Sequence, residues 1–356
     1  MYAFIGDLHL GVKLPKADFL KSLDKFLGII KTHKEECHCI FVVGDLFDHK
    51  LSIQEAKFAA LFMVNLVYNN CGRNGKQHVP VHFIHGTYTH DNEQYEIFMP
   101  MLEKLQNVSV FYTKSACYKT LYNGVKVLYL PQEYGDIDYS EIFKDSYDII
   151  VGHGPMSSET KIPCKSTQYE IMHSAEKLGS ISKICVFGHY HGYTDFGNNV
   201  YYTGPWLRWQ YGEDTDRCFF LCDDEFKVET VPNDVALEFV TIDIYTPEEL
   251  RNAVSSKIEH PHRFIIHCKN KDLNEYHAIM NLYKKNPYIK YQIISERMEN
   301  EDVDVQIEEN HSTHPIVEPV PALIEYVKDK YDIDVSDEVK DYEAKINRDS
   351  KPTTET

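Results

Sequence analysis

The first 200 residues alternate short apolar runs with longer segments of helical periodicity, and this alternation limits the possible folds most strongly. Continuous apolar runs are typical of strands that are buried on both faces. Segments at 18–33 and 52–69 have apolar residues at helical spacing. The pattern therefore predicts a layered α/β domain. Its expected strands lie at residues 2–5, 39–43, 79–84, 125–130, 148–151 and 184–187.

A second, smaller α/β unit is predicted after this domain. Strands are expected at 236–244, 263–268 and 288–295. A helix should begin at Thr246, a good N-cap residue, with Pro247 in its first position, and 272–286 should form another helix. We therefore expect a first domain at 1–232 and a βαβαβ capping domain at 233–298.

The remaining segment is acidic and weakly patterned. Residues 299–356 contain 17 acidic and 6 basic residues, a net charge of −11 out of −18 for the 356-residue chain. Residues 299–319 predict a linker, and 320–356 predict a tail of two short helices. Such a tail is too small to fold alone, so it packs on the body or docks on a partner.

The overall composition excludes some classes of protein. A net charge of −18 argues against a surface that coats nucleic acid, but it does not exclude a nuclease that binds cations. The nine cysteines have no Cys-x-x-Cys spacing, which favours free thiols in a reducing compartment. No apolar run is long enough to span a membrane, and the first expected strand starts at Tyr2, so we expect a cytoplasmic protein.

Five glycine-linked clusters of Asp and His follow expected strands. Ligands of layered α/β folds bind at the carboxyl ends of strands, so all five clusters should face one crevice. Their sequences are Gly6-Asp7-Leu8-His9, Gly44-Asp45-Leu46-Phe47-Asp48, Gly86-Thr87-Tyr88-Thr89-His90-Asp91, Gly152-His153-Gly154 and Gly188-His189-Tyr190-His191-Gly192.

The spacing within the clusters suits metal binding. In Asp-x-His and His-x-His, residues i and i+2 of extended chain point the same way, so both can reach one metal cluster. A preceding glycine lets the backbone turn tightly. Mixed carboxylate and imidazole ligands suit Mn²⁺, Fe or Zn²⁺ better than a Ca²⁺ cage. A single such cluster would usually be a surface turn, but five in order predict a metal centre.

This series of motifs, within residues 1–215, resembles that of the calcineurin-like metallophosphoesterases, which implies a β-sandwich flanked by helices and two divalent ions, most often Mn²⁺, with Mg²⁺, Fe or Zn²⁺ as alternatives. Carried over by position, one ion would be held by Asp7, His9 and His191. The other would be held by His153 and His189, with Asp45 bridging the two ions. His90 would be the catalytic acid, oriented by Asp91.

The chain departs from the motif of that family at one position. The family usually has Gly-Asn-His-Asp, whose Asn binds the second ion, whereas Thr89 precedes His90 here. Thr87, Thr89 or a water molecule would have to take the place of the Asn side chain.

A further resemblance narrows the subfamily. Residues 201–206, Arg208 and residues 211–214 are similar to the strand and loop of SbcD-type nucleases of double-strand-break repair and recombination, including phage enzymes. This implies a capping domain, a helical tail that binds an SMC-like SbcC-type ATPase, and a homodimer. For a phage-encoded chain the compartment would be the host cytoplasm. Arg208 and Trp206 would bind substrate, with a packed loop as the alternative.

The expected activity is therefore a metal-dependent DNA exonuclease or endonuclease that hydrolyses phosphodiesters by two-metal catalysis. A stand-alone phosphatase or nucleotide phosphodiesterase is the first alternative. A non-hydrolytic scaffold subunit, in which Thr89 marks the loss of a metal, is the second. The capping domain and tail favour the nuclease, because a minimal phosphatase needs neither.

Overall fold

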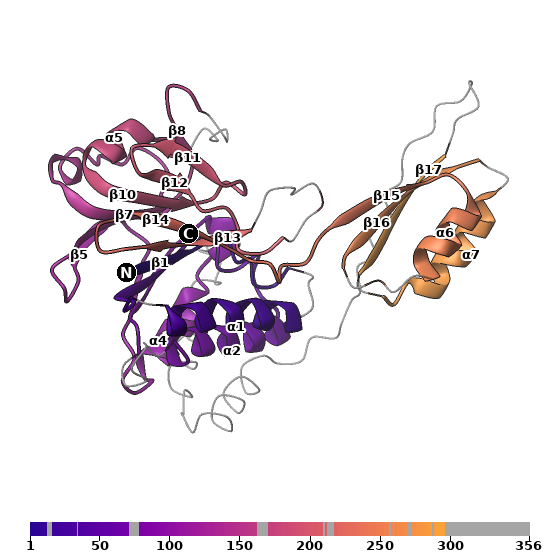
Figure 1. Cartoon of the computed structure of the whole chain (residues 1–356), viewed down its shortest axis with the longest axis horizontal. Coiled ribbons are helices and arrows are strands. Elements are labelled where there is room, and N and C mark those ends of the chain that lie inside the picture. Colours follow the sequence, from indigo (N-terminus) through magenta and orange to yellow (C-terminus); the bar gives the residue numbers. More distant parts are fainter. Residues whose placement is uncertain are drawn as a thin grey trace, which may run out of the picture.

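The chain is a mixed α/β protein, and its described residues form two six-stranded sheets, one three-stranded sheet and one two-stranded sheet (Figure 1). The computed structural model describes residues 1–12, 16–33, 35–70, 78–161, 170–208, 211, 217–255, 258, 260–269, 272–286 and 288–295. The expected linker at 299–319 and the expected helical tail at 320–356 lie outside these residues.

The first sheet has six strands in the order β14-β13-β1-β2-β3-β4. Four neighbouring strands are parallel, and β13 and β14 extend the sheet in antiparallel fashion. The bounds are β1 (Tyr2–Ile5), β2 (Cys39–Val43), β3 (Val81–Ile84), β4 (Val110–Thr113), β13 (Cys218–Cys222) and β14 (Val228–Pro232).

The second sheet also has six strands, in the order β11-β12-β10-β7-β6-β5. Its four inner strands are parallel and its two edge strands are antiparallel to their neighbours. The bounds are β5 (Cys117–Thr120), β6 (Lys126–Leu130), β7 (Tyr147–His153), β10 (Ser182–Gly188), β11 (Thr194–Gly197) and β12 (Val200–Tyr202).

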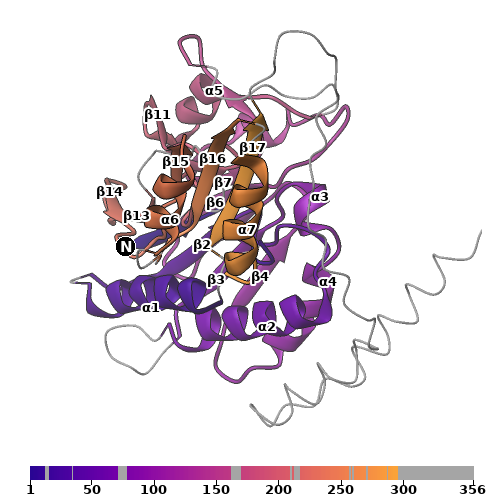
Figure 2. The same cartoon turned by 90° about the vertical axis from the view of Figure 1, so that its right-hand side faces the viewer.

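The two sheets pack face to face, because alternate residues of each strand point into a shared apolar layer. Phe4 and Phe41 stack there with ring centroids 5.1 Å apart, and Ile149 and Val186 face them from the second sheet. The other face of the first sheet is covered by α1 (Lys16–Thr32), α2 (Ile53–Tyr68) and α4 (Tyr95–Glu103) (Figure 2). The other face of the second sheet packs on α5 (Ala175–Ser180).

The third sheet stands apart from the sandwich (Figure 1). It has three parallel strands in the order β15-β16-β17, and α6 and α7 pack with it around a core of its own. The elements are β15 (Val240–Ile244), α6 (Pro247–Ser255), β16 (His262–Cys268), α7 (Leu273–Tyr283) and β17 (Ile289–Ser295). The hydroxyl of Tyr288 donates to Asp18 of α1 over 3.1 Å, which links this unit to the sandwich.

The local elements follow from the sequence. Helix α2 begins with a capping box, in which Ser52 accepts from the backbone of Glu55 and Glu55 accepts from that of Ser52. At α6, Thr246 accepts from the backbone of Glu249 over 3.2 Å, as expected of an N-cap. The short elements are η1 (Ile142–Lys144), α3 (Tyr88–Asp91), and β8 (Met156–Ser157) paired with β9 (His173–Ser174). Within the described part of the chain, no helix has both the length and the apolar character of a membrane span.

Candidate metal centre

The five Asp and His clusters converge on one edge of the sandwich. They follow β1, β2 and β3 in the first sheet, and β7 and β10 in the second. Because these strands are parallel within each sheet, their carboxyl ends lie at the same edge. All six predicted ligands lie there in two groups whose members are within 4.8 Å of one another.

The first group contains Asp7, His9 and His191. The Nε2 atoms of His9 and His191 lie 3.3 Å apart, although 182 residues separate them in sequence. His9 is completely buried, and its Nδ1 lies 3.5 Å from a carboxylate oxygen of Asp48. A carboxylate behind a ligand imidazole fixes the orientation of the ring and raises its basicity.

The second group contains Asp45, His153 and His189. The Nδ1 atom of His153 donates to the backbone carbonyl oxygen of Val43 over 2.9 Å, because a carbonyl can only accept. This leaves the Nε2 atom of His153 facing Oδ2 of Asp45, 3.2 Å away. The imidazole is therefore held as a metal ligand would be, with one nitrogen tied to the backbone and the other directed into the group.

A hydrogen bond between the two sheets joins the groups. The backbone N–H of His189 donates to Oδ1 of Asp7 over 2.9 Å. Three of the predicted ligands in the first sheet have left-handed backbone conformations, with φ of 48° at Asp7, 46° at His9 and 43° at Asp45. Such strain outside glycine persists only where the surrounding structure enforces it, and it is concentrated at functional sites.

Two glycines make this close approach possible. A Cβ atom on Gly44, whose φ is +84°, would lie 2.2 Å from Nδ1 of His153. A Cβ atom on Gly86 would lie 2.2 Å from the backbone nitrogen of Asp45. Neither position can hold a larger residue without displacing a candidate ligand.

The electrostatics of the groups follow from burial and from the paired charges. Burial opposes charge on His153, but the Asp45 and Asp7 carboxylates raise its pKa to about 9. Burial also opposes charge on Asp45, yet neighbouring histidines, led by His153, hold its pKa well below the usual range. Burial and the neighbouring His153 lower the pKa of His189 to about 4. A neutral His189 is the form that binds a metal ion.

The predicted acid His90 lies beside the first group. Its ring meets that of His9 edge-on with centroids 4.9 Å apart, and His9, Asp48 and His90 form a third set of converging ligand atoms. The Nδ1 atom of His90 lies 2.5 Å from the backbone carbonyl oxygen of Asp48. His90 is half-buried, so part of its side chain is open to solvent beside the first group.

The expected role of Asp91 in orienting His90 is wrong. Asp91 is fully buried and accepts hydrogen bonds from the backbone N–H groups of Gly86, over 2.6 Å, and Phe47, over 3.1 Å. Neighbouring residues in a helical turn point in different directions, so the Asp91 carboxylate faces the loops instead of the His90 ring. Burial and the charge of Asp45 raise the pKa of Asp91 to about 6. Asp91 ties two ligand-bearing loops together.

Of the alternatives for the Asn of the family motif, which were Thr87, Thr89 and a water molecule, Thr89 is not placed to take its position. The Thr89 side chain is exposed in the helical turn α3. Thr87, directly after Gly86, lies in the second group instead: its N–H donates to Oδ1 of Asp45 over 2.6 Å, and its hydroxyl is 3.2 Å from Oδ2 of Asp45 and 3.5 Å from Nε2 of His153. The two residues Tyr88 and Thr89 lie between this position and His90, so the motif cannot be aligned without a gap.

Sequence reasoning missed Gln132, which lies beside Thr87. Its Oε1 is 3.0 Å from the Thr87 hydroxyl, and its side chain is 6% exposed. Gln132 follows β6 at the same edge of the second sheet. A polar residue after an expected strand was the available signal, but the preceding Pro131 broke the pattern of glycine-linked clusters.

Trp206, which the sequence suggested as a substrate-binding residue, and His85 have structural roles. Trp206 is 1% exposed and packs edge-on against Phe219 with centroids 5.2 Å apart, so it has no free face to stack on a base, and the packed-loop alternative is correct. Arg208 is partly buried, and its role in substrate binding stays a prediction. His85 lies within 2.9 Å of two backbone carbonyl oxygens, those of Gly86 and Asn92, and so braces the loop.

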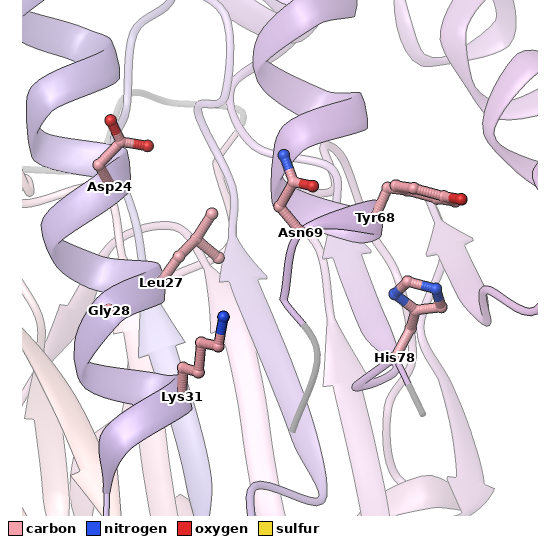
Figure 3. Close-up of a pocket in the computed structure, with 7 residues that line it drawn as sticks. All are labelled: Asp24, Leu27, Gly28, Lys31, Tyr68, Asn69 and His78. Atoms are coloured by element: carbon pink, nitrogen blue, oxygen red, sulfur yellow. The ribbon is translucent and has the colours of Figure 1, made fainter. Parts of the chain in front are cut away.

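One groove of the molecule lies away from this chemistry. It has a volume of about 620 Å³ and lies between the C-terminal halves of α1 and α2, lined by Asp24, Leu27, Gly28, Lys31, Tyr68, Asn69 and His78 (Figure 3). The helix ends that form it lie at the amino ends of the parallel strands. It contains none of the candidate ligands, so we do not place the function there.

The donor set fits divalent metal ions. Asp7 Oδ2 is buried and, among the described residues, has no hydrogen-bond partner, although a buried carboxylate oxygen needs a donor or a cation. Two imidazole Nε2 atoms facing each other at 3.3 Å have the spacing of two ligands on one ion. No protein-family model matches the chain, and no curated protein is significantly similar to it in sequence. The site itself therefore carries the functional argument.

Proposed function

We propose that this chain is a two-metal phosphoesterase that hydrolyses phosphodiesters in DNA. The observation that carries the proposal is the pair of Asp and His groups, linked by the contact between His189 and Asp7, with His90 beside them. Mn²⁺ is the ion that we favour for this mixture of carboxylate and imidazole ligands, with Mg²⁺, Fe and Zn²⁺ as alternatives. The resemblance to calcineurin-like metallophosphoesterases supports the same conclusion.

The chain's own residues have separate roles in this chemistry. Bound divalent ions would activate a water molecule and neutralise charge on the phosphate oxygens. The six ligand side chains would hold the ions in place before substrate arrives, which lowers the free-energy cost of rearranging the centre during the reaction. His90, held at Nδ1 by the Asp48 carbonyl, carries a proton on Nε2 when charged and donates it to the leaving sugar oxygen.

Exposed tyrosines beside the second group favour a nucleic acid over a simple phosphate ester. Tyr88, next to Thr87, is 53% exposed, and Tyr134, next but one to Gln132, is 40% exposed. The Tyr88 N–H donates to the Tyr134 hydroxyl over 3.4 Å, so the two residues are neighbours. Exposed aromatic rings near a phosphate-binding centre are suited to stacking on unpaired bases.

We also propose that the chain works as the nuclease subunit of an SbcCD-like complex in DNA recombination or repair. The three-stranded unit of β15, β16 and β17 is joined to the sandwich and would serve as the capping domain. An SMC-like ATPase and a second copy of the chain are the proposed partners, on the basis of the resemblance. A version that ends near residue 300 should lose the ATPase, and full co-purification would exclude the tail as its binding site.

The test is a hydrolysis assay on the metal-free full-length chain with Mn²⁺ added back. Linear duplex DNA, single-stranded DNA and para-nitrophenyl phosphate are compared, with His90→Gln as the matched control. We expect Mn²⁺-dependent cleavage of DNA that the variant loses. Hydrolysis of para-nitrophenyl phosphate without cleavage of DNA would instead identify a phosphatase, and inactivity on all three with Mn²⁺ bound would leave a scaffold role.

A further inference from the structure

The second ligand group lacks a fourth strong ligand among its own cluster residues. Asp45, His153 and His189 supply three side chains, and Thr87 takes the position at which the family usually has an amide. A neutral hydroxyl is a weaker ligand for a divalent cation than an amide oxygen. A side chain that brings an amide oxygen from elsewhere in the fold would complete the group.

Gln132 brings such an oxygen to the group from the second sheet. Its Oε1 is 3.0 Å from the Thr87 hydroxyl, which is itself 3.2 Å from Asp45 Oδ2 and 3.5 Å from His153 Nε2. Donor atoms about 2.1 Å from one ion lie about 3 Å from their neighbours. The Thr87 hydroxyl therefore lies at the spacing of a coordination shell from two ligands of the second group, and the Gln132 oxygen lies at the same spacing from that hydroxyl.

Glu170 determines which end of the Gln132 amide faces the centre. The Gln132 amide nitrogen donates to Oε1 of Glu170 over 2.7 Å, and a carboxylate can only accept, so the NH₂ end is fixed there. The amide oxygen must then point toward Thr87. Glu170 is placed for this contact by its backbone bridge to Tyr134, two residues after Gln132.

The backbone of Gln132 is held as firmly as its side chain. Its N–H donates to the carbonyl oxygen of His85 over 3.2 Å, which ties the end of β6 to the end of β3. The side chain is 6% exposed, so its amide must find partners within the protein. The buried amide is thus held between Glu170 and the Thr87 hydroxyl, with its oxygen on the side of the second group.

We propose that Gln132 supplies the amide oxygen ligand of the second ion and that Glu170 is its positioning residue. The inference rests on the two-metal centre proposed above and adds a ligand from a different strand. The Asn of the family motif has been replaced in function by a residue that lies 45 positions after Thr87 in the chain. In this arrangement Thr87 is not itself a ligand, and it holds the Asp45 carboxylate in place through its two hydrogen bonds to Asp45.

The test is calorimetric titration of the metal-free full-length chain with Mn²⁺ alone. Wild type should bind two ions. Gln132→Ala should weaken the second site at least tenfold and leave the first unchanged, and electron paramagnetic resonance should lose the signal of coupled Mn²⁺ pairs. Glu170→Gln, which lets the Gln132 amide rotate, should also weaken the second site. Gln292→Ala, at an exposed glutamine of β17, is the matched control, and melting in chelator verifies folding.

The outcomes separate this inference from the proposed function. Two sites of wild-type affinity in Gln132→Ala would overturn the inference, and loss of the second site in Thr87→Val alone would assign the ligand to the hydroxyl. The inference would also be overturned if wild type bound a single Mn²⁺ ion and Gln132→Ala bound it with the same affinity. A chain that binds two ions, loses one in Gln132→Ala, and yet cleaves no phosphodiester would contradict the proposed function alone.

Discussion

His90 and Asp48 are joined by a hydrogen bond from the imidazole Nδ1 to the backbone carbonyl oxygen, with a separation of 2.5 Å. Because the carbonyl can only accept, Nδ1 carries a proton, and Nε2 is the ring nitrogen left free of this contact. The side-chain carboxylate of Asp48 lies 3.5 Å from Nδ1 of His9. Asp48 thus orients both a candidate ligand and the candidate acid.

Replacing His90 with glutamine should remove the proton donor and leave the metal ligands in place. We expect kcat on DNA to fall about 10²- to 10⁴-fold, the usual contribution of general acid catalysis. Steady-state kinetics measures this effect, and Mn²⁺ titration should give unchanged affinity. A variant with wild-type kcat would remove His90 from the mechanism, and a variant without bound Mn²⁺ would make it a ligand.

Replacing Asp91 with alanine should destabilise the fold. The buried N–H groups of Gly86 and Phe47 would lose their acceptor, which we expect to lower the free energy of unfolding by about 2–4 kcal/mol. Urea unfolding in chelator measures this without a contribution from metal. Asp91→Asn keeps one acceptor oxygen, so its free energy of unfolding should lie between those of wild type and Asp91→Ala. Unchanged stability with a thousandfold loss of turnover would restore the catalytic role that the sequence predicted.

Two glycine-to-alanine substitutions should have opposite effects. Gly44→Ala places a Cβ atom 2.2 Å from His153 Nδ1, so we expect weaker Mn²⁺ binding and lower stability. Gly28 lies within α1, and a Cβ atom there would meet no other atom within 4 Å, so Gly28→Ala should raise stability by about 1 kcal/mol and leave activity unchanged. Thermal melting and Mn²⁺ titration compare the two. Loss of activity in Gly28→Ala would give the groove in Figure 3 a role.

Stability should fall in mild acid because of His82. Burial lowers the pKa of His82 to about 3, and its Nδ1 lies 2.7 Å from the Tyr129 hydroxyl. An unfolded histidine binds a proton near pH 6.5, so between pH 6.5 and 3 the unfolded state binds more protons and stability falls as the pH falls. This histidine alone should lower the free energy of unfolding by about 2 kcal/mol between pH 6.5 and 5.

Denaturant unfolding in chelator at several pH values checks the effect of His82. His82→Leu removes the titrating group, so its stability should depend less steeply on pH over this range. An identical slope in the variant and wild type would show that other groups cause the acid sensitivity.

The sequence predicted the parts of the fold that are buried on both sides. Strands β1, β2, β7 and β10 each contain a continuous apolar run, and their positions were correct to within about two residues. Strands β4 and β5 were missed because their residues are half-buried or exposed and give little periodic signal. The run Cys218–Cys222 is apolar throughout, but its pairing with β1 crosses more than 200 residues and has no local signature.

The site was predictable where chemistry and spacing coincide. The six candidate ligands could be recognised from the sequence alone, because each follows a strand and a glycine. They are Asp7, His9, Asp45, His153, His189 and His191. The directions of side chains within the turn α3 carry no such signal. For this reason the sequence assigned Asp91 the wrong role and could not choose between Thr87 and Thr89. Gln132 depends on a contact between β3 and β6 that only the assembled sheets create.

The candidate centre draws half of its ligands from each sheet. The layer between the sheets is apolar, and apolar contact is non-directional, so by itself it specifies the alignment of one sheet over the other only loosely. The hydrogen bond between Asp7 and His189 is directional, so it fixes the position of one sheet relative to the other. A load that shears one sheet against the other would separate the two halves of the ligand set, so the integrity of the centre depends on how firmly the two sheets are held together.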